Sequence, residues 1–114
     1  MSGAAPAPER GLLDLLGLAA RARALVHGTD ATRRGVRDGE LAGVLLAADT
    51  SPTQSKKLVP LLEARGVPYA VCLTRGAIGA ALGRGDVSAV GITDRNFARR
   101  ALELAAALPI PRDE

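Results

Sequence analysis

The sequence predicts an α/β protein, a three-layer α/β/α sandwich around a small four-stranded mixed sheet. Two observations predict this fold. Segments with apolar residues at helical spacing alternate along the chain with short apolar runs. One of these runs, Leu41–Ala48, is almost continuously apolar, which is typical of a central strand covered on both faces. A chain of 114 residues has the length of one domain that can bury a core without cross-links.

The chain is expected to start with a tail and a helix. Residues 1–8 are mostly small residues and prolines with little to bury, and we expect a disordered N-terminal tail. Pro8 to Arg10 opens a helix with one apolar face, and the single domain spans residues 9–108. The apolar positions of this helix are Leu12, Leu15, Leu16, Ala19 and Ala20.

The stretch Ala24–Gly39 predicts a short strand that passes directly into a helix. The strand ends at His27, and the helix runs to Asp38, where the following glycine suits a left-handed C-cap. Thr29 or Asp30 can cap the start of the helix, because either side chain can accept a hydrogen bond from a free backbone N–H.

Arginines share one face of this second helix, and smaller residues turn the other way. The arginines are Arg33, Arg34 and Arg37, and the smaller residues are Thr32, Gly35 and Val36. A helix N-terminus offers free N–H groups and a partial positive charge, so this face suits phosphate groups. The alternative is a solvated face on which Asp30 and Arg34 form an ordinary i, i+4 pair.

After its central strand the chain predicts a turn, a helix and another strand. Residues 49–52 form the turn, and a third helix is expected over residues 53–65. Gly66 ends that helix. The next strand is Val67–Leu73, with Pro68 near its start, where a missing N–H is tolerated.

The last part of the chain predicts two helices around one strand. The expected elements are a turn at residues 74–76, a helix at 77–82, a turn at 85–86, a strand at 87–93 and a helix at 94–107. Gly83 closes the first of these helices, and Asp94 caps the second. Pro109 and Pro111 stop the final helix, which leaves residues 109–114 as a short C-terminal tail.

The composition allows a basic surface but few stacking contacts. The formal charge is +3, and Lys56 and Lys57 are the only lysines among 15 basic residues. A mild excess of positive charge permits nucleic-acid binding. Tyr69 and Phe97 are the only aromatic residues, so a single-strand binder built on exposed rings is not expected.

Metal, redox and membrane functions are not expected from this sequence. Cys72 is the only cysteine and His27 the only histidine, so the chain can form no disulfide within itself and a zinc site is not expected. We find no leader sequence and no apolar stretch as long as a bilayer span. We therefore expect a cytoplasmic protein without a membrane partner.

Catalysis and cofactor binding are not expected either. The glycines at positions 76, 79, 83 and 85 lack the spacing of a dinucleotide fingerprint. No serine lies in a nucleophile elbow, and the single histidine has no motif partner. The sequence therefore predicts that the protein is not an enzyme and binds no cofactor.

Several segments, in their order and spacing, resemble a known family. They are Leu15–Ala22 followed by Leu25–Gly28, Val44–Asp49, Gly66–Tyr69 and Ile78–Gly83. The family is the kink-turn-binding superfamily of ribosomal proteins L7Ae/L30e/Gadd45, in particular its small bacterial YlxQ-like branch. The resemblance covers about Leu12 to Leu104 and implies the same L30e-like fold.

The resemblance implies RNA binding without catalysis. In the family, the helix after a Gly-Thr turn enters a kink-turn, where an Asn and a Glu read guanines and a Lys contacts the backbone. Here Gly28 and Thr29 match the turn, and Arg34 keeps the positive charge. Asp30 and Ala31 replace the Asn and the Glu. An ionised Asp30 donates no hydrogen bond and Ala31 has no polar group, so we expect contacts mainly to the RNA backbone.

A second loop completes the interface that the resemblance implies. In the family this loop covers a flipped-out nucleotide, and its positions match Leu73, Thr74 and Arg75, although residues 74–76 could equally form a plain strand-to-helix connection. Asp49 could orient the neighbouring loop, but an Asp after a strand more often forms a turn, and we expect the turn. The predicted RNA-binding residues are Gly28, Thr29, Asp30, Arg33, Arg34, Arg37, Asp49, Leu73, Thr74 and Arg75.

The sequence thus predicts a monomeric protein that binds structured RNA, either ribosomal RNA or another non-coding RNA, with the ribosome as one candidate location. Two alternatives stay open. One is a protein-interaction module of the same fold that has lost RNA recognition, as Ala31 would permit. The other is a small-molecule or nucleotide phosphate site, which requires a concave pocket at Gly28–Ala31.

Overall fold

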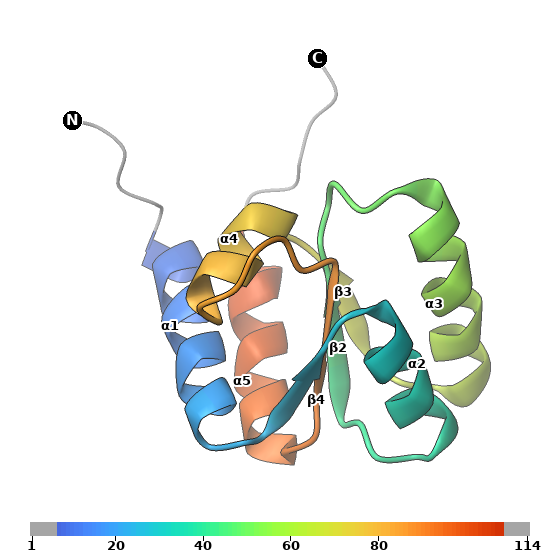
Figure 1. Cartoon of the computed structure of the whole chain (residues 1–114). Helices are drawn as coiled ribbons and strands as arrows, with labels where there is room; N and C mark the ends of the chain where they lie inside the picture. The colour runs from blue at the N-terminus through green and yellow to red at the C-terminus, as the bar shows by residue number, and fades with distance from the viewer. Residues whose placement is uncertain (1–6, 109–114) are drawn as a thin grey trace.

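The computed structural model describes residues 7–108, in which helices and strands alternate in the predicted order (Figure 1). The elements are α1 (Ala7–Arg21), β1 (Leu25–His27), α2 (Thr29–Arg37), β2 (Gly43–Leu46), α3 (Pro52–Arg65), β3 (Tyr69–Val71), α4 (Arg75–Ala81), β4 (Ala89–Ile92) and α5 (Arg95–Ala106). Helix α1 begins at Ala7, within the stretch expected to be the tail. The rest of the predicted tails, with Pro109 and Pro111, lies outside the described residues.

The strands form one mixed, four-stranded sheet, as predicted, and their order in it is β1-β4-β2-β3. Strand β4 is antiparallel to both of its neighbours, and β2 is parallel to β3. In this register Leu46 of β2 lies opposite Ala89 of β4 and Val71 of β3. Strands β1, β2 and β3 therefore run in the same direction, and their carboxyl ends reach the same edge of the sheet.

Helices cover both faces of this sheet. Figure 1 shows α1, α4 and α5 on one face and α2 and α3 on the other. The predicted three-layer sandwich is therefore confirmed. Strand β2 is buried along its whole length, as the continuous apolar run predicted.

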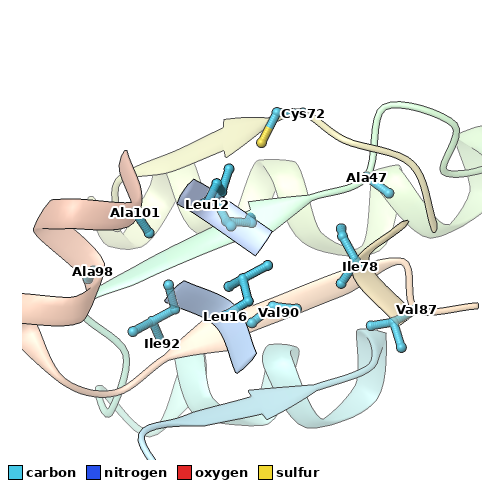
Figure 2. Close-up of a cluster of buried hydrophobic side chains, with 11 residues drawn as sticks. Leu12, Leu16, Ala47, Cys72, Ile78, Val87, Val90, Ile92, Ala98 and Ala101 are labelled. Carbon is cyan, nitrogen blue, oxygen red and sulfur yellow. The ribbon is translucent and has the colours of Figure 1, made fainter. Parts of the chain in front are cut away.

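Two hydrophobic clusters join the layers. The larger one lies between the sheet and helices α1, α4 and α5, and it includes the fully buried Leu12, Leu16 and Ile78 (Figure 2). The smaller one lies under α2 and α3 and includes Leu58 and Leu62. Each such side chain contributes roughly 1.5–3 kcal/mol of burial free energy, so packing rather than helix propensity holds the short helices in place.

Helix α2 begins differently from the prediction. Its N-cap is Gly28, with a φ of 97°, and the prediction that Thr29 or Asp30 caps the helix is wrong because both residues lie inside its first turn. The Gly28 N–H donates to the carbonyl of Ala89 at 2.8 Å, so the contact with β4 fixes a backbone conformation that only glycine adopts easily. At the other end, Gly39 has a φ of 70°, which confirms the predicted left-handed position.

Helix α4 also begins earlier than predicted. Residues 74–76 are not a turn, because Thr74 is the N-cap and its Oγ1 accepts a hydrogen bond from the Ala77 N–H at 3.1 Å. Arg75 is therefore the first helical residue. The following strand starts later than predicted, since the Val87 N–H donates to the carbonyl of Arg75 at 3.1 Å and not to the sheet.

The N-caps of α3 and α5 follow the ordinary rules for helix starts. The Ser51 hydroxyl accepts from the Gln54 N–H at 3.3 Å. The predicted cap of α5 is confirmed, because the Asp94 carboxylate accepts from the Phe97 N–H at 2.9 Å. Such caps stabilise a helix by about 1 kcal/mol each.

Candidate nucleic-acid interface

Four loops meet at the edge of the sheet where β1, β2 and β3 end and β4 begins. We call this surface the loop edge; it comprises residues 28–34, 48–50, 73–75 and 87–89. Main-chain hydrogen bonds join the loops in pairs: Gly28 N–H to Ala89 O at 2.8 Å, Ala48 N–H to Leu73 O at 2.9 Å and Ala47 N–H to Ser88 O at 2.8 Å. The strand spacing of a sheet puts the ends of β1 and β3 roughly 14 Å apart. The predicted residues from three distant segments, except Arg37, therefore share one surface.

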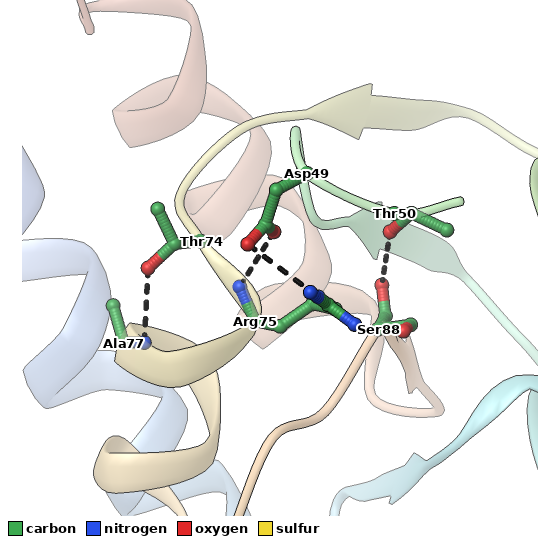
Figure 3. Close-up of polar contacts among 6 residues, drawn as sticks. All are labelled: Asp49, Thr50, Thr74, Arg75, Ala77 and Ser88. Atoms are coloured by element: carbon green, nitrogen blue, oxygen red, sulfur yellow. Dashed lines mark hydrogen bonds and ion pairs between the residues drawn. The ribbon is translucent and has the colours of Figure 1, made fainter. Parts of the chain in front are cut away.

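Asp49 joins the second loop to the third (Figure 3). Its Oδ1 accepts a hydrogen bond from the Arg75 N–H at 2.8 Å, and its Oδ2 lies 3.4 Å from the Arg75 Nε. The hydrogen bond from the Arg75 backbone N–H is the main cause that lowers the pKa of the Asp49 carboxyl below its usual value, and the guanidinium adds to it. The predicted turn at Asp49 is confirmed, since the Thr50 N–H donates to the Ala47 carbonyl at 3.2 Å, and the carboxylate also orients the neighbouring loop.

Arg75 is held by this contact but stays accessible. Its side chain is 43% exposed, and that of Asp49 is 45% exposed. The Nε atom is enclosed and forms an ion pair with the Asp49 carboxylate at 3.4 Å. The contact fixes the direction of the Arg75 side chain at the loop edge while water still reaches part of it.

Leu73 and Thr74 support the third loop from within. Leu73 has a φ of 66°, a left-handed conformation that is costly for a residue with a side chain. Its side chain is half-buried and packs against the larger cluster, and its carbonyl accepts the Ala48 N–H. The hydroxyl of Thr74 is used as the cap of α4. The main contribution of these two predicted residues is thus to shape the loop.

The face of α2 is arranged as predicted. Thr32, Gly35 and Val36 are buried, whereas Asp30 and Arg34 are exposed. The described ion pairs, Arg75 with Asp49 and Arg100 with Glu103, do not include the alternative pair between Asp30 and Arg34. Arg34 is therefore not paired with the acid on its own helix.

The arginines of α2 do not all lie at the loop edge. Arg33 is half-buried, and its Nε is enclosed without a hydrogen-bond partner in the described part of the chain. Arg37 lies in the last turn of the helix, roughly 12 Å along the axis from its first residue. The carbonyl of Arg37 accepts a hydrogen bond from Arg65 Nη1 at 3.1 Å, which ties α2 to α3. Arg37 is thus placed away from the edge.

The sequence did not indicate the fourth loop as part of this surface. The carbonyl of Ser88 accepts from the Thr50 hydroxyl at 3.3 Å and from the Ala47 N–H at 2.8 Å (Figure 3). The glycines at positions 83 and 85 mark a loop before β4. Its place beside the turn at Asp49 follows from the sheet order, which the sequence pattern does not contain.

The structure also bears on metal, membrane and thiol chemistry. Within residues 7–108, no three His, Cys, Asp or Glu side chains are grouped so that they could hold a metal ion, and no helix has both the length and the apolar character to cross a bilayer. Burial raises the pKa of the Cys72 thiol to about 11. The thiol is therefore protonated at neutral pH, and Cys72 acts as a small core residue.

Comparisons with known proteins agree with this architecture. A profile of the family described as "Ribosomal protein L7Ae/L30e/S12e/Gadd45 family" matches residues 11–102. A protein named RNA-binding protein YlxQ from Bacillus subtilis (strain 168) is 34% identical over 90 residues, which are 79% of this chain and 90% of that protein.

Two solved structures share the fold. One is a protein with unknown function from Bacillus halodurans C, with 33% identity, a TM-score of 0.80 and coverage of 83% of this chain and 96% of that chain. The other is a 15.5kD RNA binding protein of Giardia lamblia, with 23% identity, a TM-score of 0.72 and coverage of 93% of this chain and 91% of that chain. The second likeness concerns the fold alone.

Proposed function

Because this chain belongs to the ribosomal protein L7Ae/L30e/S12e/Gadd45 family, we propose that it is a non-catalytic protein that binds structured RNA through the loop edge. The name of the Bacillus subtilis relative, which describes an RNA-binding protein, supports the same proposal. The RNA is ribosomal or another folded non-coding RNA, and the expected compartment is the cytoplasm. This function requires no cofactor and no metal.

One observation carries the proposal: the start of α2 lies on the same edge as the Asp49–Arg75 pair. The N-cap of α2 is a glycine, which has no side chain that could accept a hydrogen bond from the first free N–H groups of the helix. These N–H groups and the positive end of the helix dipole suit phosphate oxygens. Arg34 lies on the exposed face of α2, roughly 7.5 Å along the axis from its first residue, and Arg75 lies across the edge. The surface therefore offers two separate cationic positions to one RNA.

The chemistry of the edge favours contacts to the RNA backbone over contacts to bases. Guanidinium groups bind phosphate oxygens well, with two parallel hydrogen bonds. At the positions that read guanines in the family, this chain has Asp30 and Ala31. Neither an ionised aspartate side chain nor an alanine side chain can donate a hydrogen bond to a base. Affinity is then dominated by the release of counterions and falls steeply with salt.

The double variant Arg34→Ala with Arg75→Ala tests this proposal. The probe is a fluorescein-labelled RNA hairpin that contains a kink-turn internal loop, and the dissociation constant is measured at several salt concentrations. Loss of two phosphate contacts is expected to weaken binding about 10- to 100-fold at about 0.1 M salt and to flatten the salt dependence by about 1.5 units of slope.

The matched control is Lys56→Ala with Lys57→Ala on α3, which removes the same charge from exposed positions outside the loop edge. We expect this control to bind like the parent protein. Equal binding by parent and edge variant would show that the loop edge is not the RNA site. A parent that binds no RNA but forms a stable complex with a protein would favour the interaction module instead.

A further inference from the structure

A second basic surface lies beside the edge strand β1, outside the loop edge. It is a pocket of about 440 Å³ between the end of α1, strand β1 and the segment that follows α4. Its polar lining consists of Arg21, Arg23, His27 and Arg84, and its apolar lining includes Leu25. Figure 1 shows α1 and α4 on the face of the sheet opposite to α2 and α3.

The charge of this pocket is entirely positive. Its lining holds three arginines and no carboxylate. Arg21, Arg23 and Arg84 are exposed, and none of them takes part in an ion pair within the described residues. Asp14 lines the neighbouring groove together with Arg21. A concave surface with one sign of charge focuses the electrostatic field and attracts anions.

Arg23 is held in this pocket by a strained backbone. It has a φ of 58°, the left-handed conformation in which helices usually end with glycine. Its N–H donates to Ala20 O at 3.1 Å, and the Ala24 N–H donates to Ala19 O at 2.8 Å, so the chain leaves α1 through a tight C-cap. An arginine here costs conformational free energy that a glycine would not. Such strained positions cluster at functional sites.

The backbone also fixes the position of Arg84. Its N–H donates to Gly79 O at 2.8 Å, and Gly83 before it has a φ of 72°. The carbonyl of Gly85 lies so close to Gly79 that a Cβ atom there would collide with it. The segment after α4 is therefore held firmly against the helix, and Arg84 is presented to the pocket from a fixed loop.

The pocket continues into the loop edge. His27 lines the pocket and ends β1, and the next residue, Gly28, is the N-cap of α2. An RNA strand with a phosphate bound at the start of α2 therefore passes the opening of the pocket when the strand continues along β1. Because β1 is an edge strand of the sheet, no further strand from residues 7–108 covers this side.

We infer that this pocket is a second phosphate-binding subsite, which holds the sugar–phosphate backbone of the RNA strand that leaves the loop edge. The inference rests on the proposed function and extends its interface. Guanidinium groups supply paired N–H donors that match phosphate oxygens, and the imidazole of His27 adds one more donor. The lining contains no Phe, Tyr or Trp ring and no side-chain amide, and its arginines match phosphate oxygens, so we expect the subsite to depend little on base sequence.

The double variant Arg23→Gly with Arg84→Gln tests this subsite, since glycine keeps the left-handed backbone while it removes the charge. The full chain is titrated with the labelled kink-turn hairpin. Each lost phosphate contact is expected to weaken binding about fivefold to tenfold at about 0.1 M salt and to lower the salt slope by about 1. With a hairpin whose flanking helix is trimmed to the internal loop, the difference from the parent protein should disappear.

The control Lys56→Gln with Lys57→Gln removes two charges from the opposite layer and should leave binding unchanged. If this control weakens binding as much as the pocket variant, the effect is one of net charge and the subsite is refuted. If the pocket variant binds both hairpins like the parent protein while Arg34→Ala with Arg75→Ala does not, the subsite is refuted and the loop edge stands. If neither variant loses affinity, both proposals are refuted.

Discussion

At the scale of the residue, the contact between Asp49 and Arg75 connects two loops that are distant in the sequence. One carboxylate receives the first N–H of α4 at 2.8 Å and faces the guanidinium of the same residue at 3.4 Å. Asp49 therefore acts both as a partner for the helix start and as a guide for the Arg75 side chain. Removing the carboxylate would affect the stability of the fold and the geometry of the loop edge together.

This contact predicts a specific pH dependence of stability. The pKa of the Asp49 carboxyl is lower in the folded protein than its ordinary value, chiefly because of the hydrogen bond from the Arg75 backbone N–H. Its ionised form therefore stabilises the fold fully above the unfolded pKa, and this contribution is lost as pH falls through the folded pKa. Urea unfolding of the parent protein and of Asp49→Asn between about pH 7 and pH 2 should show a difference near neutrality that shrinks in acid. A difference that stays constant across this range would contradict the assignment.

Arg23 predicts a conflict between stability and binding. Since a non-glycine residue in the left-handed region costs about 1–2 kcal/mol, Arg23→Gly should raise the free energy of unfolding by about 1 kcal/mol while it weakens RNA binding. The comparison variant is Leu73→Gly, which relieves the same kind of strain but also removes a side chain from the larger cluster. It should not be stabilised. Chemical denaturation measures both, and a destabilised Arg23→Gly protein would argue against strain at this position.

At the scale of the element, the sequence predicted the order and type of the helices and strands but not all of their limits. Central strand β2 was predictable from the sequence because its continuous apolar run reflects burial on both faces. The start of α4 was not, because its first N–H finds its acceptor in Asp49, 26 residues earlier in the chain. The cap of α2 was missed for the same reason, since a contact with Ala89 of β4 fixes Gly28.

Helix α4 and the loop after it offer a matched test of packing. A Cβ at Gly79 would collide with the carbonyl of Gly85, whereas a Cβ at Gly76 would meet only Asp86 Oδ1 at 3.7 Å. Gly79→Ala should therefore destabilise the protein by about 1–3 kcal/mol. Gly76→Ala should stabilise it by roughly 0.5–1 kcal/mol, because alanine loses less backbone freedom in a helix. Thermal unfolding of both variants gives the comparison, and equal effects would show that the loop does not pack against α4 as described.

At the scale of the whole molecule, the sheet order creates the candidate interface. The order β1-β4-β2-β3 with only β4 reversed brings three strand ends and their loops to one edge. The resemblance to a family supplied candidate residues, and the fold brings Asp49, Thr74 and Arg75 together as expected. It sets Arg37 apart, near α3, because the length of α2 carries it away from the edge. Helical spacing predicts which face of a helix a residue occupies, but the distance of that residue from the loop edge depends on which turn of the helix it lies in.

The basic pocket shows the same limit of sequence analysis. Its arginines come from the end of α1 and from the loop after α4, and they are separated by about 60 residues of chain. Only the packing of α1 and α4 on the same face of the sheet places these arginines around one depression beside β1 (Figure 1). The loop edge and the pocket together make the side of the molecule at β1 a continuous candidate surface for RNA.

The central claim is that the chain binds folded RNA mainly through its backbone, and a direct test compares two hairpins over a series of salt concentrations. One hairpin contains a kink-turn, and in the other Watson–Crick pairs replace the sheared G·A pairs. Because Asp30 and Ala31 offer no donor to guanine, we predict a steep salt dependence for both RNAs and a difference in affinity of less than about tenfold, or about 1.4 kcal/mol. Failure to bind either hairpin, or a preference for the kink-turn of more than about 100-fold with little salt dependence, would contradict the account.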